Sequence, residues 1–375
     1  MKIGFVGGGT GGHFYPLIAV AQEIRDRKND TEIDLYYFGP NIYNQELLQK
    51  YDIKFSYVPA GKIRRYSSAF FLNILDVFKI TAGIFVAILK LYWYYPDVIF
   101  SKGGYTSVPI LIAAWFLRIP VVIHESDVIP GRANKLAGRF AKYIAISWTA
   151  TQEFFDSSRV ALTGIPIRRE LRLQLPNARE VLSLPSNIPV VYVTGGSLGA
   201  DRINKMILKS LDKLLPHMVI YHQAGEDNVD RVRKTARELL VSRPELLENY
   251  YVVGSLDAAT VNAVLCAADL VVTRAGTTTL YEISAHNKPA IVIPIPEEIS
   301  HDQRTNAYTY ARNGAAVVME ESNLTPNLLQ TELFSIITDV DKYYTMRNAT
   351  SDLTSSDASN TISDILISIG YEHKS

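Results

Sequence analysis

Three hydroxyl-bearing residues and one carboxylate lie close together in the second half of the chain. Thr277, Thr278 and Thr279 directly follow Gly276, and Glu282 comes one turn further along the expected helix. Hydroxyls and unpaired backbone N–H groups at a helix N-terminus, just past the end of a strand, make a phosphate site. A nearby carboxylate suits the two hydroxyls of a ribose, so the group indicates a nucleotide. Glu282 is equally well explained by the positive end of the helix dipole.

A second chemical stretch lies near the start of the chain. Residues 7–12 are Gly-Gly-Gly-Thr-Gly-Gly and are followed by His13. Backbone N–H groups of such a loop can approach a diphosphate. The ordinary pKa of histidine lies near neutrality, so His13 is our candidate general base. A histidine that only packs at the start of a helix is the alternative.

The same loop also fits a dinucleotide fingerprint, because Gly7, Gly9 and Gly12 satisfy G-x-G-x-x-G. In an NAD-dependent enzyme the next strand ends near an acid that binds the ribose. Here the expected strand 33–38 ends in Gly39 and Pro40 instead. An NAD-dependent oxidoreductase is therefore disfavoured.

Two further loops follow expected strands of the first half. One is Ser101-Lys102-Gly103-Gly104-Tyr105, and the other spans residues 124–134, HESDVIPGRAN. In an open α/β sheet the loops at the carboxyl ends of the strands gather at one edge. We therefore expect these loops to lie beside the His13 loop.

The elements that must carry these loops alternate between short apolar strands and helices, which predicts parallel sheets. The alternation restarts at residue 190, so we expect two Rossmann-like domains that face each other across a cleft. The hinge is expected near Gly164 and Pro166, giving domains of residues 1–163 and 164–349, with a last helix at about 350–375 returning to the first. The expected strands are 2–6, 33–38, 54–58, 98–101, 121–124, 143–147, 190–194, 219–222, 251–253, 270–273, 290–295 and 316–319.

Composition narrows the class of protein further. At 375 residues, 47% hydrophobic and 20% charged, the chain is typical of a two-domain globular protein, and its net charge of +0 gives no reason to expect nucleic acid. The single cysteine, Cys266, lies in an apolar stretch, so we expect its side chain to be buried. One cysteine cannot form an internal disulfide, which indicates a reducing compartment. No secretory signal is recognised, so the expected place is the cytoplasm. Neither a Walker motif nor a metal-binding motif is found.

The stretch before the fourth strand is unusually apolar. Residues 63–78, which begin with Ile63 and end with Phe78, combine helical apolar spacing with Arg64 and Arg65. Such a face can rest on an anionic membrane surface or pack inside the domain. Residues 80–89 are too short to span a membrane, and we interpret them as part of a buried helix pair.

Several of these motifs together resemble the MurG family, the GT-B glycosyltransferases that transfer N-acetylglucosamine from UDP-GlcNAc to lipid I. The resemblance rests on residues 7–13, on residues 101–105, on GGSLGA at 195–200, and on the stretch 269–307. It implies an inverting transferase of peptidoglycan synthesis that makes lipid II at the cytoplasmic face of the membrane, as a peripheral protein without a cofactor. Within the family, residues 63–78 would contact the inner leaflet.

The resemblance also implies roles for individual residues. The acceptor diphosphate would bind at Gly11, Gly12, Gly103, Gly104 and Tyr105. His13 would be the base, with Asp127 as a rival. The residues expected to bind UDP-GlcNAc are Thr10, Gly11, Gly12, Asp127, Arg168, Ser197, Leu256, Thr277, Thr278, Thr279, Glu282, Asp302 and Gln303.

Four positions depart from the family pattern. Ser126 and Asp127 replace an amide pair, Leu198 replaces a glutamine, and Asp302 stands where the first of two polar side chains is usual. The alternatives are therefore another GT-B enzyme, such as a lipid glycosyltransferase or a UDP-GlcNAc epimerase, and a non-catalytic nucleotide-sugar-binding membrane protein.

Overall fold

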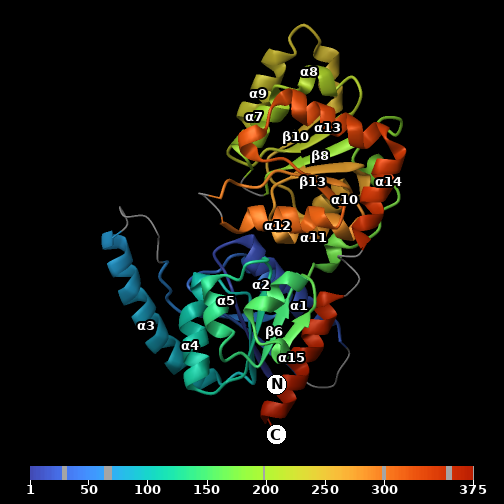
Figure 1. The fold of residues 1–375 in the computed structure, drawn as a ribbon. Helices are drawn as coiled ribbons and strands as arrows, with labels where there is room; N and C mark the ends of the chain where they lie inside the picture. Colours follow the sequence, from blue (N-terminus) through green and yellow to red (C-terminus); the bar gives the residue numbers. More distant parts are fainter. Residues whose placement is uncertain (28–31, 63–69, 197–198, 298–300, 352–356, 375) are drawn as a thin grey trace. The chain divides into compact units, whose positions relative to one another are not determined.

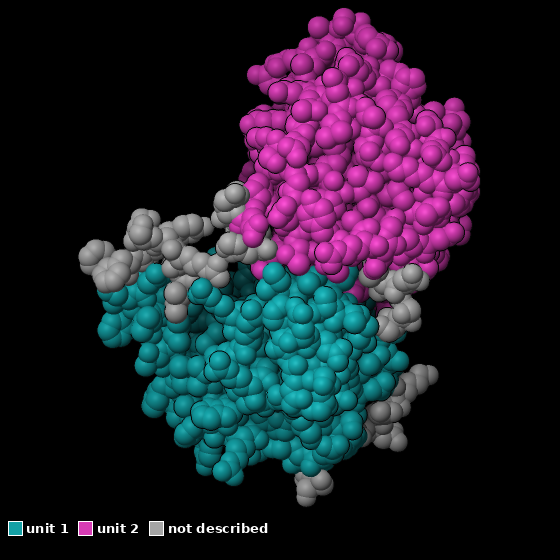
Figure 2. Space-filling model, viewed as in Figure 1, with its two compact units in different colours: residues 1–168, 356–375 teal, residues 169–355 magenta. Residues whose placement is uncertain are grey.

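The protein forms two compact units. The computed structural model describes residues 1–27, 32–62, 70–196, 199–297, 301–351 and 357–374. Unit 1 comprises Met1–Arg168 and Ser356–Ser375, and unit 2 comprises Arg169–Ser355 (Figure 2). The chain thus leaves unit 1 once and returns to it at its end.

Unit 1 is built on a parallel seven-stranded sheet with the order β3-β2-β1-β4-β5-β6-β7. Its central strands are almost wholly buried, as expected for a parallel sheet that is covered on both faces. The strands are β1 (Lys2–Val6), β2 (Asp34–Gly39), β3 (Ile53–Tyr57), β4 (Val98–Ser101), β5 (Val121–Glu125), β6 (Tyr143–Ile146) and β7 (Val160–Leu162).

Two hydrophobic cores cover the faces of this sheet. Helices α1 (Gly11–Asp26), α2 (Gln45–Lys50) and α15 (Ala358–Lys374) contribute to one core. Helices α3 (Phe70–Tyr94), α4 (Val108–Phe116) and α5 (Arg132–Ala137) contribute to the other. Helix α15 lies beside α1 and places Ile362, Leu366 and Ile369 in the first core (Figure 1).

Unit 2 repeats the plan with a parallel six-stranded sheet in the order β10-β9-β8-β11-β12-β13. Its strands are β8 (Val190–Thr194), β9 (Val219–Gln223), β10 (Tyr250–Val253), β11 (Leu270–Thr273), β12 (Ala290–Val292) and β13 (Ala316–Val318). Residues of alternating strand positions, such as Val191 and Val193 of β8, enter one large core.

Helices also cover both faces of the second sheet. The large core includes residues of α7 (Asp201–Leu208), α8 (Leu211–Leu214), α9 (Val229–Leu239), α13 (Pro326–Thr338) and α14 (Val340–Ala349). Figure 1 shows α10 (Ala258–Ala267), α11 (Thr277–Ala285) and α12 (His301–Arg312) on the other side of the strands. A short helix, α6 (Ala178–Val181), contacts α10. The predicted pair of parallel α/β sheets is confirmed.

Some expected details are wrong. The strand expected over 290–295 ends at Val292, and Pro294 just beyond it has no N–H group to donate. Residues 80–89 do not belong to a buried helix pair but to the single 25-residue helix α3. Phe85 is 65% exposed and Leu89 54% exposed, because only a narrow stripe that includes Ala87 and Leu91 packs on the unit.

Both sheets have a topological switch point, where the connections turn from one side of the first strand to the other. In unit 1 it lies between β1 and β4, and in unit 2 between β8 and β11. Ligands of open α/β sheets bind outside the carboxyl ends of the strands at such points. The loops that carry His13, Lys102 and Arg274 leave these strands, so topology and sequence motifs indicate the same places.

Candidate active site

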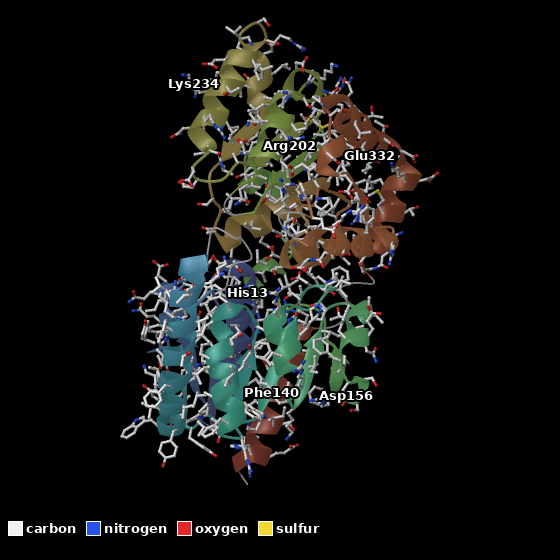
Figure 3. The ribbon with its side chains drawn as sticks, turned by 60° about the vertical axis from the view of Figure 1, so that its left-hand side comes forward. His13, Phe140, Asp156, Arg202, Lys234 and Glu332 are labelled. Atoms are coloured by element: carbon white, nitrogen blue, oxygen red, sulfur yellow. The ribbon has the colours of Figure 1, made fainter. Side chains whose placement is uncertain are left out.

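The loop after β1 places His13 in the first turn of α1 (Figure 3). Its Nδ1 atom lies 2.7 Å from Oγ1 of Thr10, and its backbone N–H donates to the carbonyl oxygen of Thr10. Thr10 and Gly12 are exposed, and Gly11 and His13 are half-buried. The loop therefore offers backbone groups to a ligand while its histidine is held by a local contact.

The loop after β4 lies against the His13 loop. A Cβ built on Gly104 would lie 3.5 Å from Nε2 of His13, and one built on Gly9 would lie 3.2 Å from the ring of Tyr105. Gly103 and Gly104 have φ values of 78° and 80°, which disfavour any residue with a side chain. Glycine is thus required for this approach, and of the predicted residues Gly104 lies against His13 and Tyr105 against Gly9.

The loop after β5 completes the group. A Cβ on Gly103 would lie 2.7 Å from Oδ1 of Asn134, in the helix that follows this loop. Asn134 donates through Nδ2 to the carbonyl oxygen of His124 at 3.0 Å and to Oε2 of Glu125 at 2.9 Å. The three loops of unit 1 are therefore in direct contact, as the sequence predicts.

A buried lysine connects two of these loops. Lys102 is 2% exposed, and its Nζ lies 2.5 Å from Nδ1 of His124 and also donates to Oγ of Ser126. The Nε2 atom of His124 lies 2.8 Å from the carbonyl oxygen of Gly164, which can only accept. Nε2 therefore carries the proton of a neutral ring, and Nδ1 accepts from Lys102.

Glu125 is the buried acid of the same region. Its carboxylate accepts from the backbone N–H groups of Asp127 and Gly131, both at 3.0 Å, besides Asn134. Burial raises the pKa of Glu125 to about 7, and the negative charge of Asp127 adds to this effect. The three N–H donors act in the opposite direction by stabilising the carboxylate.

The histidine and the lysine are shifted in the direction expected for buried bases. Burial lowers the pKa of His13 to about 4, with a contribution from the positive charge of Lys102, whereas the charge of Asp127 opposes the shift. Burial also lowers the pKa of Lys102 to about 8, against the charges of Glu125 and Asp127. His13 is therefore neutral at pH 7, so one of its ring nitrogens can accept a proton, but it is a weaker base than its ordinary pKa indicates.

Arg168 ends unit 1. Its guanidinium carbon lies 4.2 Å from the centroid of the Tyr15 ring in α1, and its buried Nε has no hydrogen-bond partner among the described residues. This cation–π contact restrains the guanidinium group.

In unit 2 the candidate anion site begins at Gly276, the N-cap of α11. Thr277 is buried and Thr278, Thr279 and Glu282 are half-buried in the first turns of the helix. Gly276 has no side chain that could cap the helix, so the N-cap residue gives the first N–H groups of α11 no side-chain acceptor. This is the geometry that the sequence predicts for a phosphate site.

A second arginine holds the β11–α11 turn. Arg274 donates to the carbonyl oxygens of Ile293 at 3.2 Å and Pro294 at 3.3 Å, and it pairs with Glu321 at 2.5 Å. Both charged side chains are about seven-eighths buried, at 13% and 15% exposure. The turn before α11 is therefore fixed to the segments that follow β12 and β13.

The remaining predicted residues of unit 2 lie in loops and helix starts at the same edge of the sheet. Leu256 is half-buried in the loop between β10 and α10, and Asp302 and Gln303 lie in the first turn of α12. The side-chain oxygen of Gln303 accepts from the N–H of Ile295 at 3.2 Å, so part of this amide is engaged by the protein itself. Ser197 and Leu198 lie outside the described residues.

Sequence reasoning gave no role to Lys102, Asn134, Arg274 or Glu321. A lysine inside a glycine-rich turn at a strand end was a usable signal for Lys102, because such a position is expected to be close to the switch point. The partners of Arg274 come from distant segments, and nothing in the local sequence indicates them.

Comparisons with known proteins agree with this geometry. Residues 3–146 match the glycosyltransferase family 28 N-terminal domain and residues 190–362 match its C-terminal domain. The chain is 37% identical over 345 residues to the UDP-N-acetylglucosamine–N-acetylmuramyl-(pentapeptide) pyrophosphoryl-undecaprenol N-acetylglucosamine transferase of Treponema denticola, covering 86% of this chain and 85% of that one. The transferase of the same name from Shouchella clausii is 37% identical over 354 residues, with coverage of 93% and 94%.

Solved structures share the fold. Acinetobacter baumannii MurG superposes with a TM-score of 0.74 at 23% identity, over 98% of this chain and 99% of that one. The UDP-GlcNAc 2-epimerase of Neisseria meningitidis, solved with UDP-GlcNAc, gives 0.71 at 16% identity, over 98% and 100%. The architecture is thus the GT-B class of nucleotide-sugar enzymes. The chain belongs to glycosyltransferase family 28 and, within it, to the MurG family.

Proposed function

We propose that this chain transfers N-acetylglucosamine from UDP-GlcNAc to lipid I and so forms lipid II of peptidoglycan synthesis. The observation that carries the proposal is the 37% identity to transferases of that name over most of both chains. The two switch points support it, because each is flanked by the loops that the family motifs occupy. The inverting outcome of the transfer is part of the same proposal.

The domain roles follow from these loops. Unit 2 holds the donor. The backbone N–H groups at the N-terminus of α11 donate to its diphosphate, and the carboxylate of Glu282 accepts hydrogen bonds from the ribose hydroxyls. The other donor contacts proposed for UDP-GlcNAc are Thr10, Gly11, Gly12, Asp127, Arg168, Ser197, Leu256, Thr277, Thr278, Thr279, Asp302 and Gln303.

Unit 1 holds the acceptor. Backbone N–H groups of Gly11, Gly12, Gly103 and Gly104, with Tyr105, would bind the diphosphate of lipid I. His13 is neutral at pH 7, so it can take the proton of the attacking hydroxyl, and its contact with Thr10 orients the ring. Asp127 is the rival base. Charge on the leaving UDP is stabilised by helix N–H groups and Arg168.

Membrane contact is proposed for residues 63–78, of which 63–69 lie outside the described residues, and for the rest of the outer side of α3 with the end of α4, which pack on each other (Figure 1). None of the helices in the described part of the chain combines the length and the hydrophobicity that a membrane span requires. The exposed basic side chain of Lys79 and the exposed Arg118 flank this apolar surface. The apolar surface consists of Ile74, Leu75, Val77, Phe78, Phe85, Leu89, Tyr92, Trp93, Trp115 and Phe116.

The test is incubation with radiolabelled UDP-GlcNAc and lipid I, followed by mass analysis of the lipid product. We expect a lipid that is heavier by one N-acetylhexosamine.

Glu282→Ala should weaken UDP binding about tenfold or more, as loss of a charged hydrogen-bonding partner does. Glu238→Ala, at an exposed position of α9, is the matched control. Tight UDP binding without transfer to any lipid would favour the non-catalytic alternative, and release of an epimerised UDP-sugar would favour an epimerase.

A further inference from the structure

Lys102 occupies a position that the proposed mechanism does not use. Its stem packs so closely under the first loop that a Cβ on Gly7 would lie 2.9 Å from the Cβ of Lys102. An ammonium group in such a place is destabilising unless it is paired. Its direct partners, His124 and Ser126, are both neutral acceptors. The charge of Lys102 must therefore be balanced by groups further away.

Two carboxylates provide this balance. Glu125 and Asp127 both raise the pKa of Lys102, and they lie one residue to either side of Ser126. Trp148, which lies just after β6, donates through its ring N–H to the carbonyl oxygen of Ser126 at 2.9 Å. This hydrogen bond also fixes the segment around Ser126. The segment 124–127 is therefore tied to Lys102 by two hydrogen bonds and by charge.

The same lysine is close to the proposed base. Lys102 and Gly104 belong to one turn, and the backbone of Gly104 lies against the His13 ring. The charged groups of unit 1 that act on His13 come from two elements, Lys102 after β4 and Asp127 after β5. From its own turn the ring meets the hydroxyl of Thr10. The lysine disfavours a cationic imidazole, and Asp127 favours it.

We propose that Lys102 is a positioning residue for the acid–base chemistry of this site. Its ammonium group, held between His124 and Ser126, fixes the loop that carries Asp127, and its turn lies against the ring of His13 through Gly104. The positive charge of Lys102 thereby adds to the burial that keeps His13 in the neutral form, which can accept a proton. The role of Lys102 in transfer rests on the proposed function. Its effect on the protonation of His13 is a property of the protein alone.

The first experiment therefore uses no substrate. Histidine side chains of the full chain are labelled with ¹⁵N and titrated by NMR, and the His13 signals are assigned with His13→Gln. In the wild type we expect His13 to stay neutral down to about pH 5. In Lys102→Met the opposing charge is lost, so the midpoint should rise by about one pH unit or more. Lys90→Met is the matched control, because Lys90 also donates to a serine, Ser56, at 3.1 Å in the same unit.

A double variant keeps the test decisive if Lys102→Met does not fold. Lys102→Met combined with Asp127→Asn removes both charges that act on His13. Because one of the two carboxylates that balance Lys102 is removed together with the lysine, the double variant retains fewer unbalanced charges than Lys102→Met. Its midpoint should lie above that of Asp127→Asn alone. The proposal is overturned if folded Lys102→Met titrates like the wild type, or if the double variant and Asp127→Asn titrate alike.

The second experiment measures transfer. Folded Lys102→Met should retain the wild-type affinity for UDP, while the acidic limb of its rate profile moves to higher pH by the same amount as the His13 midpoint. A lysine with a merely structural role would lower the thermal midpoint without moving this limb, and that result would also overturn the proposal. Failure of the wild type to make lipid II would instead contradict the proposed function and leave the NMR result valid.

Discussion

The guanidinium group of Arg168 lies over the ring of Tyr15, with its central carbon 4.2 Å from the ring centroid. If Arg168 stabilises the diphosphate of the donor, the ring is what fixes its orientation. A cation–π contact of this kind contributes about 0.5–1 kcal/mol. Tyr15→Leu should therefore raise the KM for UDP-GlcNAc about twofold to fivefold, as measured by initial rates. Tyr15→Phe keeps the ring face and should behave like the wild type, and an equal defect in both variants would refute this role.

The pair of Arg274 and Glu321 predicts a local loss of stability. Arg274 holds the turn before α11, and both side chains are largely withdrawn from water. Removing one partner of such a pair leaves an uncompensated charge, which costs about 3 kcal/mol. Arg274→Met should lower the free energy of unfolding by about this amount in urea titrations and should weaken UDP binding. The exposed pair of Lys234 and Glu238 provides the control, since Lys234→Met should change stability by less than about 0.5 kcal/mol.

His222 predicts a dependence of stability on pH. Its Nε2 donates to Oδ1 of Asn204 at 3.0 Å and its Nδ1 accepts from the hydroxyl of Tyr250 at 2.7 Å, so the ring is neutral. Burial lowers the pKa of His222 to about 3. The unfolded chain, with a histidine pKa of about 6.5, binds more protons below that pH. Stability should thus fall as the pH drops from about 6.5 toward 3, by up to about 1.4 kcal/mol per pH unit from this residue.

The measurement is urea unfolding of the full chain at several pH values between 4.5 and 7. His222→Gln can keep a donor and an acceptor but does not titrate, so its stability should fall less steeply over this range. The surface residue His217 of the same unit provides a control in His217→Gln. A wild-type slope that His222→Gln leaves unchanged would contradict the prediction.

The apolar surface of α3 predicts binding to lipid vesicles. Phe78 is 70% exposed and Phe85 65% exposed, and both project from a helix that buries only a narrow stripe. Figure 3 shows the outer side of α3 with its side chains directed away from the rest of unit 1. Replacing both by serine should weaken sedimentation with vesicles that contain phosphatidylglycerol by about tenfold or more, given about 1.5–3 kcal/mol for full burial of each ring. Val241→Ser, at a residue 79% exposed in unit 2, should bind like the wild type.

Much of the fold was predictable from the sequence because its strands are short, apolar and followed by glycine-rich turns. The strand Val190–Thr194 and the helix that starts at Asp201 are found where the pattern predicts them. The single helix α3 was misjudged because an apolar pattern does not distinguish packing against protein from packing against lipid. Its exposed face is visible only in three dimensions.

In the candidate site, too, features with a local sequence signal were predictable and features that depend on distant residues were not. The glycine turns and the threonines after Gly276 carry local signals, so their places were predictable. The shifted pKa of His13 was not, because it depends on burial and on Lys102, which lies on another strand end. The contact between Arg274 and Glu321 joins residues that are far apart in the sequence, and no local pattern encodes such a pairing.

The return of α15 to unit 1 has a consequence for synthesis on the ribosome. Ile362, Leu366 and Ile369 pack with Phe14, Leu17 and Ile18, which are translated some hundreds of residues earlier. Unit 2 is made of one continuous stretch and can close its core while the nascent chain is still being extended. The apolar surface of unit 1 that packs against α15 stays uncovered until α15 has been synthesised. Unit 1 is therefore translated first but completes its fold last.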